Sequence, residues 1–294
     1  MKNEEGVVLV ITLWVLAILS LLAISFAYQM RIGIRLAGYQ VDSLRALYLA
    51  KAGVNYALCE LKKDTNEYDS LNEAWNLRKR VEFGGGMFIC QISDEEQRIN
   101  LNYATRTILE RLPGINEEIA SCLLDWQDAD SKEQIDGAED DYYQGIGKSY
   151  YCKNAAFESI EELLLVKGIN REIFDGISSL TTVYTAGVIN INTAPERVLM
   201  SLPGLNKELA QKIVYFRAGW DGKEGTEDDR IFTAPQKIKQ VEGVGEGYQQ
   251  FNQMVTTKSG NLRISSIGMI NRVIKRITVV VENNTGRVKY WQEG

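Results

Sequence analysis

The stretch VVLVITLWVLAILSLLAISFA, residues 7–27, decides the fold, because these 21 residues contain no charged side chain. In a helix that rises about 1.5 Å per residue, a run of this length spans roughly 30 Å, which is the thickness of a bilayer core. We therefore expect a helix that crosses a membrane, and we interpret every other motif in the chain against that expectation.

Three interpretations of this segment are open. It is a plain membrane anchor, a secretory signal peptide cleaved after Ser25-Phe26-Ala27, or the retained helix behind a short prepilin-type leader. A secretory apolar core usually has 7 to 15 residues, which is shorter than this run. In the third case residues 1–6 are the leader, Gly6 is its last residue, and Val7 becomes the new N-terminus. The sequence that follows favours this third interpretation.

The helical pattern continues beyond the apolar run. Apolar residues recur at three- and four-residue steps, and no proline occurs before Pro113. The stripe consists of Leu44, Leu47, Ala50, Val54, Leu58 and Leu61. Such a stripe indicates a helix with one buried face. We predict one helix from Val7 to Lys63, with its first half in lipid and its second half packed on a soluble head.

Composition excludes several classes of function. The 294 residues include no histidine, which rules out Ser-His and Cys-His catalysis and histidine-ligated metals. The four cysteines, Cys59, Cys90, Cys122 and Cys152, form no C-x-x-C pair, which argues against zinc. Disulfides and free buried thiols both remain open, and Cys122 with Cys152 is the pair to test first. No residue is predicted to be catalytic, and we do not expect an enzyme.

An internal repeat fills the middle of the chain. INLNYA at 99–104 returns as ININTA at 189–194, and LPGIN at 112–116 returns as LPGLN at 202–206. Both landmarks are 90 residues apart. VKGIN at 166–170 and VEGVG at 241–245 are two further echoes. We predict four helical hairpins in two tandem pairs, with Asn102 and Asn192 as N-caps.

These hairpins resemble the helix-hairpin-helix motif, whose DNA-binding members point backbone N–H groups at a phosphate. Residues 99–250 carry 15 Lys and Arg against 25 Asp and Glu, a charge of −10. Affinity for nucleic acids depends on basic groups that neutralise phosphates, so this region has the wrong sign. We interpret the hairpins as a scaffold and expect no nucleic-acid partner.

An acidic loop follows each copy of the repeat. GAEDD at 137–141 and GTEDD at 225–229 are 88 residues apart. Calcium takes six to eight oxygens from such flexible loops, whereas most acidic runs are only solvated turns. We expect structural calcium ions in both loops, although neither has the spacing of an EF-hand. The predicted ligands are Asp125, Asp128, Asp130, Glu139, Asp140 and Asp141 in the first loop, and Asp221, Glu227, Asp228 and Asp229 in the second.

Over nearly its whole length the chain resembles protein K of type II secretion systems, a family of minor pseudopilins. The resemblance rests on Gly6-Val7 with the apolar helix, on residues 42–54, on the loop ending GAEDDYY at 137–143, and on ININTAP at 189–195. The fifth residue from Val7 is Ile11, where most pseudopilins carry a glutamate that this family also lacks. The resemblance implies a calcium-binding helical insert within a pilin-like head and a place at the tip of the pseudopilus.

The flanking segments fit this layout. Residues 86–92, 262–265, 273–282 and 287–291 are predicted strands, and Asn283 to Gly286 forms a tight turn. We predict an α+β fold with a long pilin-type transmembrane helix, a small antiparallel sheet and an inserted all-helical domain of tandem helix-hairpin-helix-like repeats. Its parts are the leader 1–6, the membrane segment 7–27, the head 28–98 and 251–294, and the insert 99–250.

The predicted function is structural. We expect a single-pass inner-membrane protein with a periplasmic head, which a prepilin peptidase cleaves between Gly6 and Val7. Its partners would be other minor pseudopilins, in a tip complex that starts the pseudopilus and exports folded proteins across the outer membrane. The alternative is a membrane-anchored helix-hairpin-helix protein that binds DNA for uptake.

Overall fold

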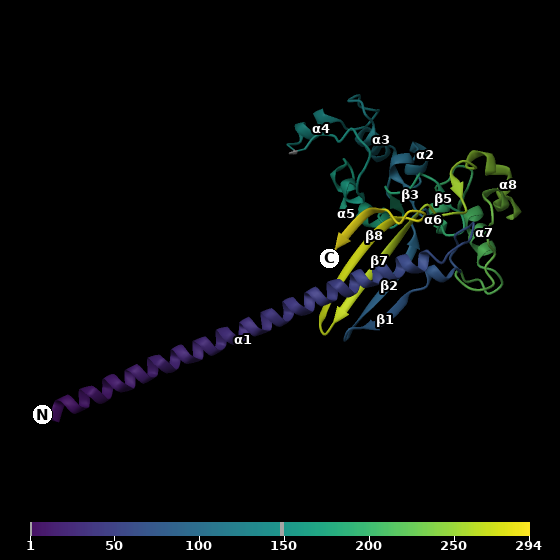
Figure 1. Ribbon diagram of the computed structural model, residues 1–294. Coiled ribbons are helices and arrows are strands. Elements are labelled where there is room, and N and C mark those ends of the chain that lie inside the picture. Colours follow the sequence, from purple (N-terminus) through teal and green to yellow (C-terminus); the bar gives the residue numbers. More distant parts are fainter. Residues whose placement is uncertain (1, 148–149) are drawn as a thin grey trace.

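The computed structural model describes residues 2–147 and 150–294, and it consists of a long helix, a sheet and a helical insert (Figure 1). Helix α1 (Lys2–Leu61) is continuous for 60 residues, which corresponds to about 90 Å. Every residue from Gly6 to Val41 is exposed. Within the described part of the chain, α1 is the one helix long and apolar enough to cross a membrane.

The sheet is antiparallel and contains five strands in the order β1-β2-β7-β8-β9. The strands are β1 (Lys79–Phe83), β2 (Gly86–Asp94), β7 (Asn261–Ile270), β8 (Val273–Glu282) and β9 (Val288–Glu293). The four predicted strands are confirmed, and β1 is an additional edge strand that the sequence did not reveal. Its charged residues and the exposed Phe83 lack the apolar pattern of a buried strand.

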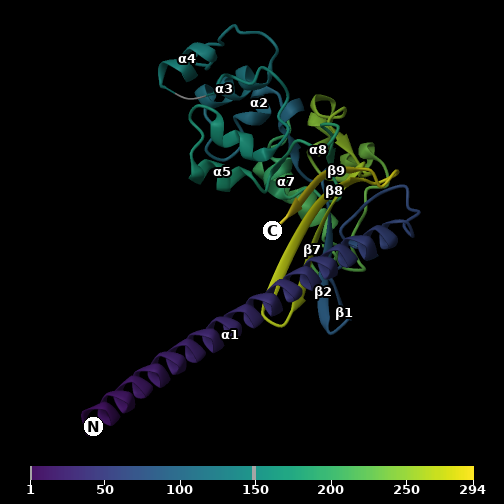
Figure 2. The same cartoon turned by 60° about the vertical axis from the view of Figure 1, so that its left-hand side comes forward.

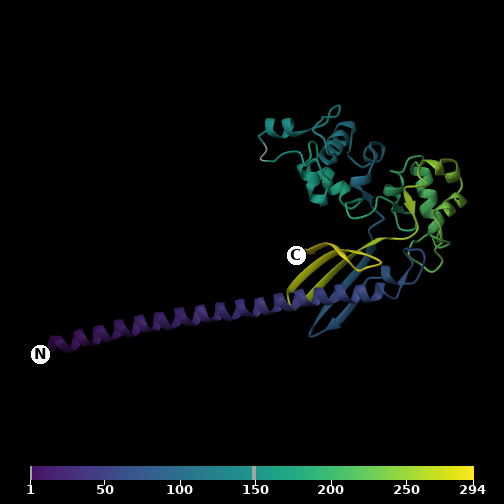
Figure 3. The same ribbon diagram turned by 45° about the horizontal axis from the view of Figure 1, so that its top comes forward.

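The C-terminal third of α1 packs across one face of this sheet (Figure 3). Two glycines allow α1 and the sheet to approach each other closely. A Cβ on Gly268 of β7 would overlap backbone atoms of Ala46 and Ala50 in α1. A Cβ on Gly53 would similarly overlap the side chain of Ser266. The buried stripe of α1 therefore lies directly on β7, where it forms one apolar core with the inner face of the sheet.

The helical insert leaves the sheet after β2 and returns at β7. It lies at the end of the sheet that points away from the N-terminus of α1, as the three views agree (Figures 1, 2 and 3). Its helices are α2 (Arg106–Leu109), α3 (Glu117–Gln127), α4 (Asp140–Gly145), α5 (Arg171–Ile177), α6 (Glu196–Leu199), α7 (Lys207–Arg217) and α8 (Val244–Gly247). Its short strands pair in parallel, β3 (Ile99–Asn100) with β4 (Thr181–Thr182) and β5 (Ile189–Asn190) with β6 (Val255–Thr256). The 3₁₀ turns of the head and insert are η1 (Ala74–Asn76), η2 (Leu101–Tyr103), η3 (Ile160–Leu165), η4 (Pro235–Gln240) and η5 (Tyr248–Gln250).

The 90-residue repeat appears in the structure as two copies of one helical pair. Helices α2 and α3 start 90 residues before α6 and α7 (196 − 106 and 207 − 117). The asparagine in the hairpin turn caps the second helix, since Asn116 and Asn206 each accept a hydrogen bond of 2.9 Å from the third backbone N–H of that helix. Asn170 caps α5 in the same way.

The predicted N-cap role of Asn102 and Asn192 is wrong. The N-caps of α2 and α6 are Thr105 and Pro195. The amide of Asn102 instead bonds the backbone of Phe157 in both directions, at 2.7 and 3.0 Å. Asn192 makes the same pair of bonds with the backbone of Phe232. Each asparagine thus fastens a later loop to its hairpin.

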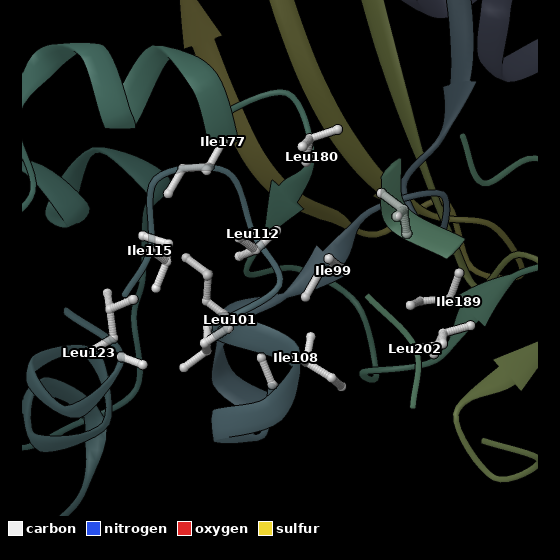
Figure 4. Close-up of a cluster of buried hydrophobic side chains, with 14 of the residues drawn as sticks. Ile99, Leu101, Ile108, Leu112, Ile115, Leu123, Ile177, Leu180, Ile189 and Leu202 are labelled. Carbon is white, nitrogen blue, oxygen red and sulfur yellow. The ribbon is translucent and has the colours of Figure 1, made fainter. Parts of the chain in front are cut away.

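One continuous apolar core fills both halves of the insert (Figure 4). Leu112 and Leu202, which occupy the same place in the two copies, are both buried, as are Ile99 and Ile189. Apolar burial of this extent is the main term that stabilises a domain with such short helices. The insert is therefore held by packing between its repeats and not by the helices themselves.

Candidate metal centre

Asp125 organises the first acidic loop from the inside. It is fully buried near the end of α3, and its carboxylate accepts hydrogen bonds from the backbone N–H groups of Gln134 and Ala138, the latter at 2.8 Å. Gly137 passes so close that a Cβ there would overlap this carboxylate. The loop is therefore wrapped around Asp125, whose oxygens are engaged by backbone donors.

Three other carboxylates of this loop come together. Asp128, Asp130 and Glu139 each place an oxygen within 4.8 Å of the other two. Glu139 is 95% buried (5% exposed), and neither of its oxygens has a hydrogen-bond partner. Asp128 Oδ1 is also buried without a partner. Buried carboxylate oxygens that lack donors carry a large desolvation cost unless a cation neutralises them.

The electrostatics of this cluster agree with its geometry. Burial, followed by the charges of Asp125 and Asp128, raises the pKa of Glu139. Burial and then the charge of Asp130 raise the pKa of Asp128. A divalent cation bound between these carboxylates would reverse both pKa shifts. The arrangement is suited to hold a hard cation by oxygen ligands.

The remaining predicted ligands of the first loop lie outside this cluster. Asp140 and Asp141 form the first turn of α4, and Asp140 Oδ1 accepts a 2.8 Å hydrogen bond from the backbone N–H of Cys152. The Asp141 side chain is exposed. Cys122 and Cys152 are buried free thiols whose Sγ atoms donate to backbone carbonyls. The structure thus contains no disulfide between them.

The second acidic loop uses its carboxylates differently. Asp228 accepts hydrogen bonds from the backbone N–H groups of Trp220 and Asp221, and Asp229 accepts one of 2.7 Å from that of Gly225. Arg217 is buried at the base of the loop, where it pairs with Glu224 and donates to the Ile191 carbonyl at 2.8 Å.

The Arg217 guanidinium therefore already supplies a positive charge to this loop. Glu227 is exposed, and the structure does not gather the four predicted ligands Asp221, Glu227, Asp228 and Asp229 around one point in the way it gathers the first three. Arg217 and Glu224 were not predicted to take part in this loop. The one sequence signal was Arg217 itself, a basic residue on the same face of α7 as the apolar Ala210 and Ile213.

A third group of carboxylates, Asp64, Asp69 and Glu73, lies in the connection after α1. Their oxygens are engaged by protein donors. Asp69 accepts from the backbone N–H of Ser259 at 2.7 Å, and Glu73 accepts from that of Ser70 and from the Trp75 indole. Because protein donors already bind these oxygens, this group lacks the unpartnered oxygens of the first loop.

A buried acidic run, Asp94-Glu95-Glu96, joins the sheet to the insert. Arg263 and Arg98 pair with Glu95, and these two arginines outweigh the effect of burial and lower its pKa. No arginine or lysine pairs with Asp94 or Glu96 among the ion pairs of the described residues. Burial, followed by the charge of Asp94, raises the pKa of Glu96 to about 8.

Amide and hydroxyl groups from distant segments hold this run in place. Asn190 donates to Asp94 Oδ2 at 2.9 Å and to the Asp69 carbonyl at 3.1 Å. Asn261 donates its side-chain and backbone N–H groups to Glu96 at 2.8 and 3.0 Å. The head and the insert are thus fastened together through buried carboxyl groups.

Comparison with known proteins shows which proteins this chain is similar to. A family model described as "Type II secretion system (T2SS), protein K" matches residues 92–186, and a helix-hairpin-helix model matches residues 185–255. The chain is 27% identical to type II secretion system protein K of Pseudomonas aeruginosa over 261 residues, which cover 79% of this chain and 77% of that protein. It is 22% identical to the protein of the same name from Klebsiella pneumoniae, over 74% of this chain and 77% of that one.

A solved structure shares the fold. The chain superposes on a chain of the GspK-GspI-GspJ complex from enterotoxigenic Escherichia coli with a TM-score of 0.72 and 17% sequence identity. The match covers 88% of this chain and 99% of the other. The chain is therefore similar to type II secretion system protein K in sequence along both the head and the insert, and it shares the fold of the solved chain.

Proposed function

We propose that this protein is the minor pseudopilin that sits at the tip of a type II secretion pseudopilus. The observation that carries the proposal is helix α1, whose first half is exposed and apolar while its last third packs on a pilin-like sheet. At the fifth position after Gly6 this helix has Ile11. Without a carboxylate there, the subunit has nothing to pair with the N-terminal amine of a neighbouring subunit, which fits an end position. The role is structural and involves no catalysis.

The proposed route to this position starts in the inner membrane. A prepilin peptidase would remove residues 1–6, and residues 7–27 would stay in the bilayer with the head in the periplasm. Gly6 fits such a cleavage site because it presents no side chain. An uninterrupted α1 supports this step, since the same helix continues from the membrane segment into the head.

The proposed partners are other minor pseudopilins. The related chain from Escherichia coli was solved in complex with GspI and GspJ, and we extend that type of assembly to this chain. Nucleic-acid binding is the less favoured function. The helix-hairpin-helix match is present, but residues 99–250 carry a charge of −10, and Glu117 and Glu118 occupy the first turn of α3 where a phosphate would bind.

We also propose that the first acidic loop holds a structural calcium ion. The residues fit the ion, since Glu139 is buried with two unpartnered oxygens beside Asp128 and Asp130. Calcium would supply the positive charge that these carboxylates lack, and Asp125 would keep the loop in shape by its backbone hydrogen bonds. Calcium in the second loop stays a prediction, and there Arg217 already supplies one positive charge.

A genetic experiment tests the proposed function. In a strain that lacks its own protein K, the wild-type chain should restore secretion and should co-purify with the other minor pseudopilins from detergent-solubilised membranes. Gly6→Leu should restore neither. If the wild-type chain supports secretion of no exoprotein but shifts DNA in a salt-dependent manner, the DNA-uptake alternative is correct.

A further inference from the structure

A groove with aromatic and polar side chains lies along α7, in the second half of the insert. It has a volume of about 490 Å³, and α7 lies far from the N-terminus of α1 (Figure 1). Residues 240–242, in the connection from η4 to α8, line it as well. The residues that α7 contributes follow three- and four-residue steps, so this α7 groove runs along the helix for two turns, about 10 Å. They are Glu208, Gln211, Lys212 and Tyr215.

Two aromatic side chains of the α7 groove are largely exposed. Trp220, in the loop after α7, is 87% exposed, and Tyr215 is 75% exposed. The hairpin fold does not require them, because the matching positions of the first repeat copy, 90 residues earlier, are Asp130 and Asp125. Neighbouring aromatic side chains that border a groove and remain in contact with water are typical of a binding site.

Trp220 is held in place although it is exposed. The buried Phe232 stacks on Phe216, with ring centroids 5.2 Å apart. Arg230 continues the stack, since its Cζ atom lies 5.3 Å from the Phe216 ring and 5.0 Å from the Trp220 ring. The backbone N–H of Trp220 donates to Asp228. A ladder of stacked groups thus connects the core to the exposed indole, and a site that is ordered in advance loses less entropy when a ligand binds.

The polar groups of the α7 groove are available and their charges balance. Among the described residues, the side chains of Arg230, Gln240 and Glu242 make no hydrogen bond or ion pair. Lys212 pairs with Glu208 at 2.9 Å. Two cations therefore accompany two carboxylates, which gives no net attraction for the phosphates of a nucleic acid.

The same polar groups distinguish between two kinds of neutral occupant. The core of a protein–protein interface is depleted of charged residues, whereas Arg230 and Glu242 line the α7 groove and are exposed. A ligand with many hydroxyl groups can use such a surface, because each hydroxyl both donates and accepts a hydrogen bond. Aromatic faces next to free donors and acceptors therefore favour a sugar over a protein surface.

We propose that the α7 groove binds a β-linked oligosaccharide of the glucose type. Sugar rings of this type present C–H groups on their faces, which stack on Trp220 and Tyr215, and hydroxyls around their edges, which bond the free groups of Arg230, Gln240 and Glu242. A β-linked chain is straight, as a groove along a helix is, whereas an α-linked chain of the same sugar curves. The inference goes beyond the proposed function. Only the source of the glycan, the wall around a periplasmic head, rests on it.

Titration calorimetry on the full chain, in a detergent without a sugar head group, tests the assignment. The probes are the β-linked tetramers chitotetraose and cellotetraose, with the α-linked maltotetraose for comparison. At least one β-linked tetramer should bind wild type at millimolar concentration or below, and more tightly than maltotetraose. Trp220→Ala should bind it about tenfold more weakly. Tyr151→Ala removes an aromatic residue that is 64% exposed outside the groove, and it should bind as wild type does.

Tryptophan fluorescence separates stacking from an indirect effect. The bound tetramer should shift the emission of wild type to the blue, because the Trp220 indole leaves water. Trp220→Phe keeps a ring to stack on, so it should bind within about threefold of wild type and lose the shift.

Equal affinity of Trp220→Ala and wild type, or equal binding of maltotetraose, would overturn the assignment. Absence of binding by wild type would overturn it too, and loss of a co-purifying pseudopilin from Trp220→Ala would then identify the groove as a protein interface. A chain that binds the tetramer but does not support secretion would refute the proposed function alone.

Discussion

The buried carboxyl groups between head and insert should make the stability of this protein fall as the pH rises. Asp69 is the best single probe. Burial is the main cause that raises its pKa from 3.8 to about 7, and the charges of Asp94 and Glu73 add to it, while the Ser259 N–H opposes it. We propose Asp69→Asn, which removes the charge and keeps an oxygen to accept from Ser259.

The sign follows from proton binding. Between pH 4 and 7 the folded state holds a proton on Asp69 that the unfolded chain has lost, so the free energy of unfolding declines over this range and levels off above it. A shift of about three pKa units corresponds to about 4 kcal/mol. For a protein of this size that amounts to a fall in Tm of roughly 8–16 °C. The pKa of Glu96, about 8, extends the decline by about one pH unit.

The assay is the thermal unfolding of the full chain in detergent, followed by tryptophan fluorescence from pH 5 to 8 in the presence of chelator. Wild type should lose Tm steadily over this range, and Asp69→Asn should lose clearly less. Asp64→Asn, in the same connection but half-buried, is the matched control and should stay close to wild type, because the charge of Asp64 raises the pKa of Asp69 less than burial and the charges of Asp94 and Glu73 do. Parallel curves for wild type and Asp69→Asn would refute the reasoning.

Three further predictions concern packing, assembly and calcium. Gly268→Ala should destabilise the head by about 1–3 kcal/mol in chemical denaturation, because its Cβ would push α1 off the sheet, whereas Gly286→Ala would strain only an exposed turn. Ile11→Glu should not improve secretion, since an unpaired carboxylate in the bilayer core costs about 2–3 kcal/mol on insertion scales; entry of this variant into the middle of pseudopili would contradict a tip position. Calcium at 100 times its Kd should stabilise wild type by about 2.7 kcal/mol, and Glu139→Gln should lose most of that gain; superimposable melting curves in chelator and calcium would disprove the site.

The sequence predicted those elements whose pattern is local. The apolar run and the stripe that follows it defined α1, and β-branched residues defined β8 over its full length, Val273–Glu282. The 90-residue repeat defined the two helical pairs. Each of these features depends on residues that are neighbours along one element, so a period or a propensity is enough to detect it.

Contacts between residues far apart in the chain could not be predicted from the sequence. Asp94-Glu95-Glu96 has the composition of a solvated turn, and it is buried because Asn190, Asn261 and Arg263 reach it from 96 to 168 residues away. The same applies to Asn102, whose local context favours an N-cap but whose amide is used by Phe157. The sequence indicated the carboxylates of the first acidic loop. Which of them come together, namely Asp128, Asp130 and Glu139, depends on how the backbone folds around Asp125.

The N-terminal sequence of the mature protein, isolated from membranes of cells with an active prepilin peptidase, tests the central claim most directly. A pseudopilin processed at Gly6 should begin at Val7, with the whole apolar part of α1 retained. A chain that begins at Tyr28 would have been cut as a secretory signal peptide, and one that still begins at Met1 would be a plain membrane anchor. Either result would contradict assembly of this protein into a pseudopilus.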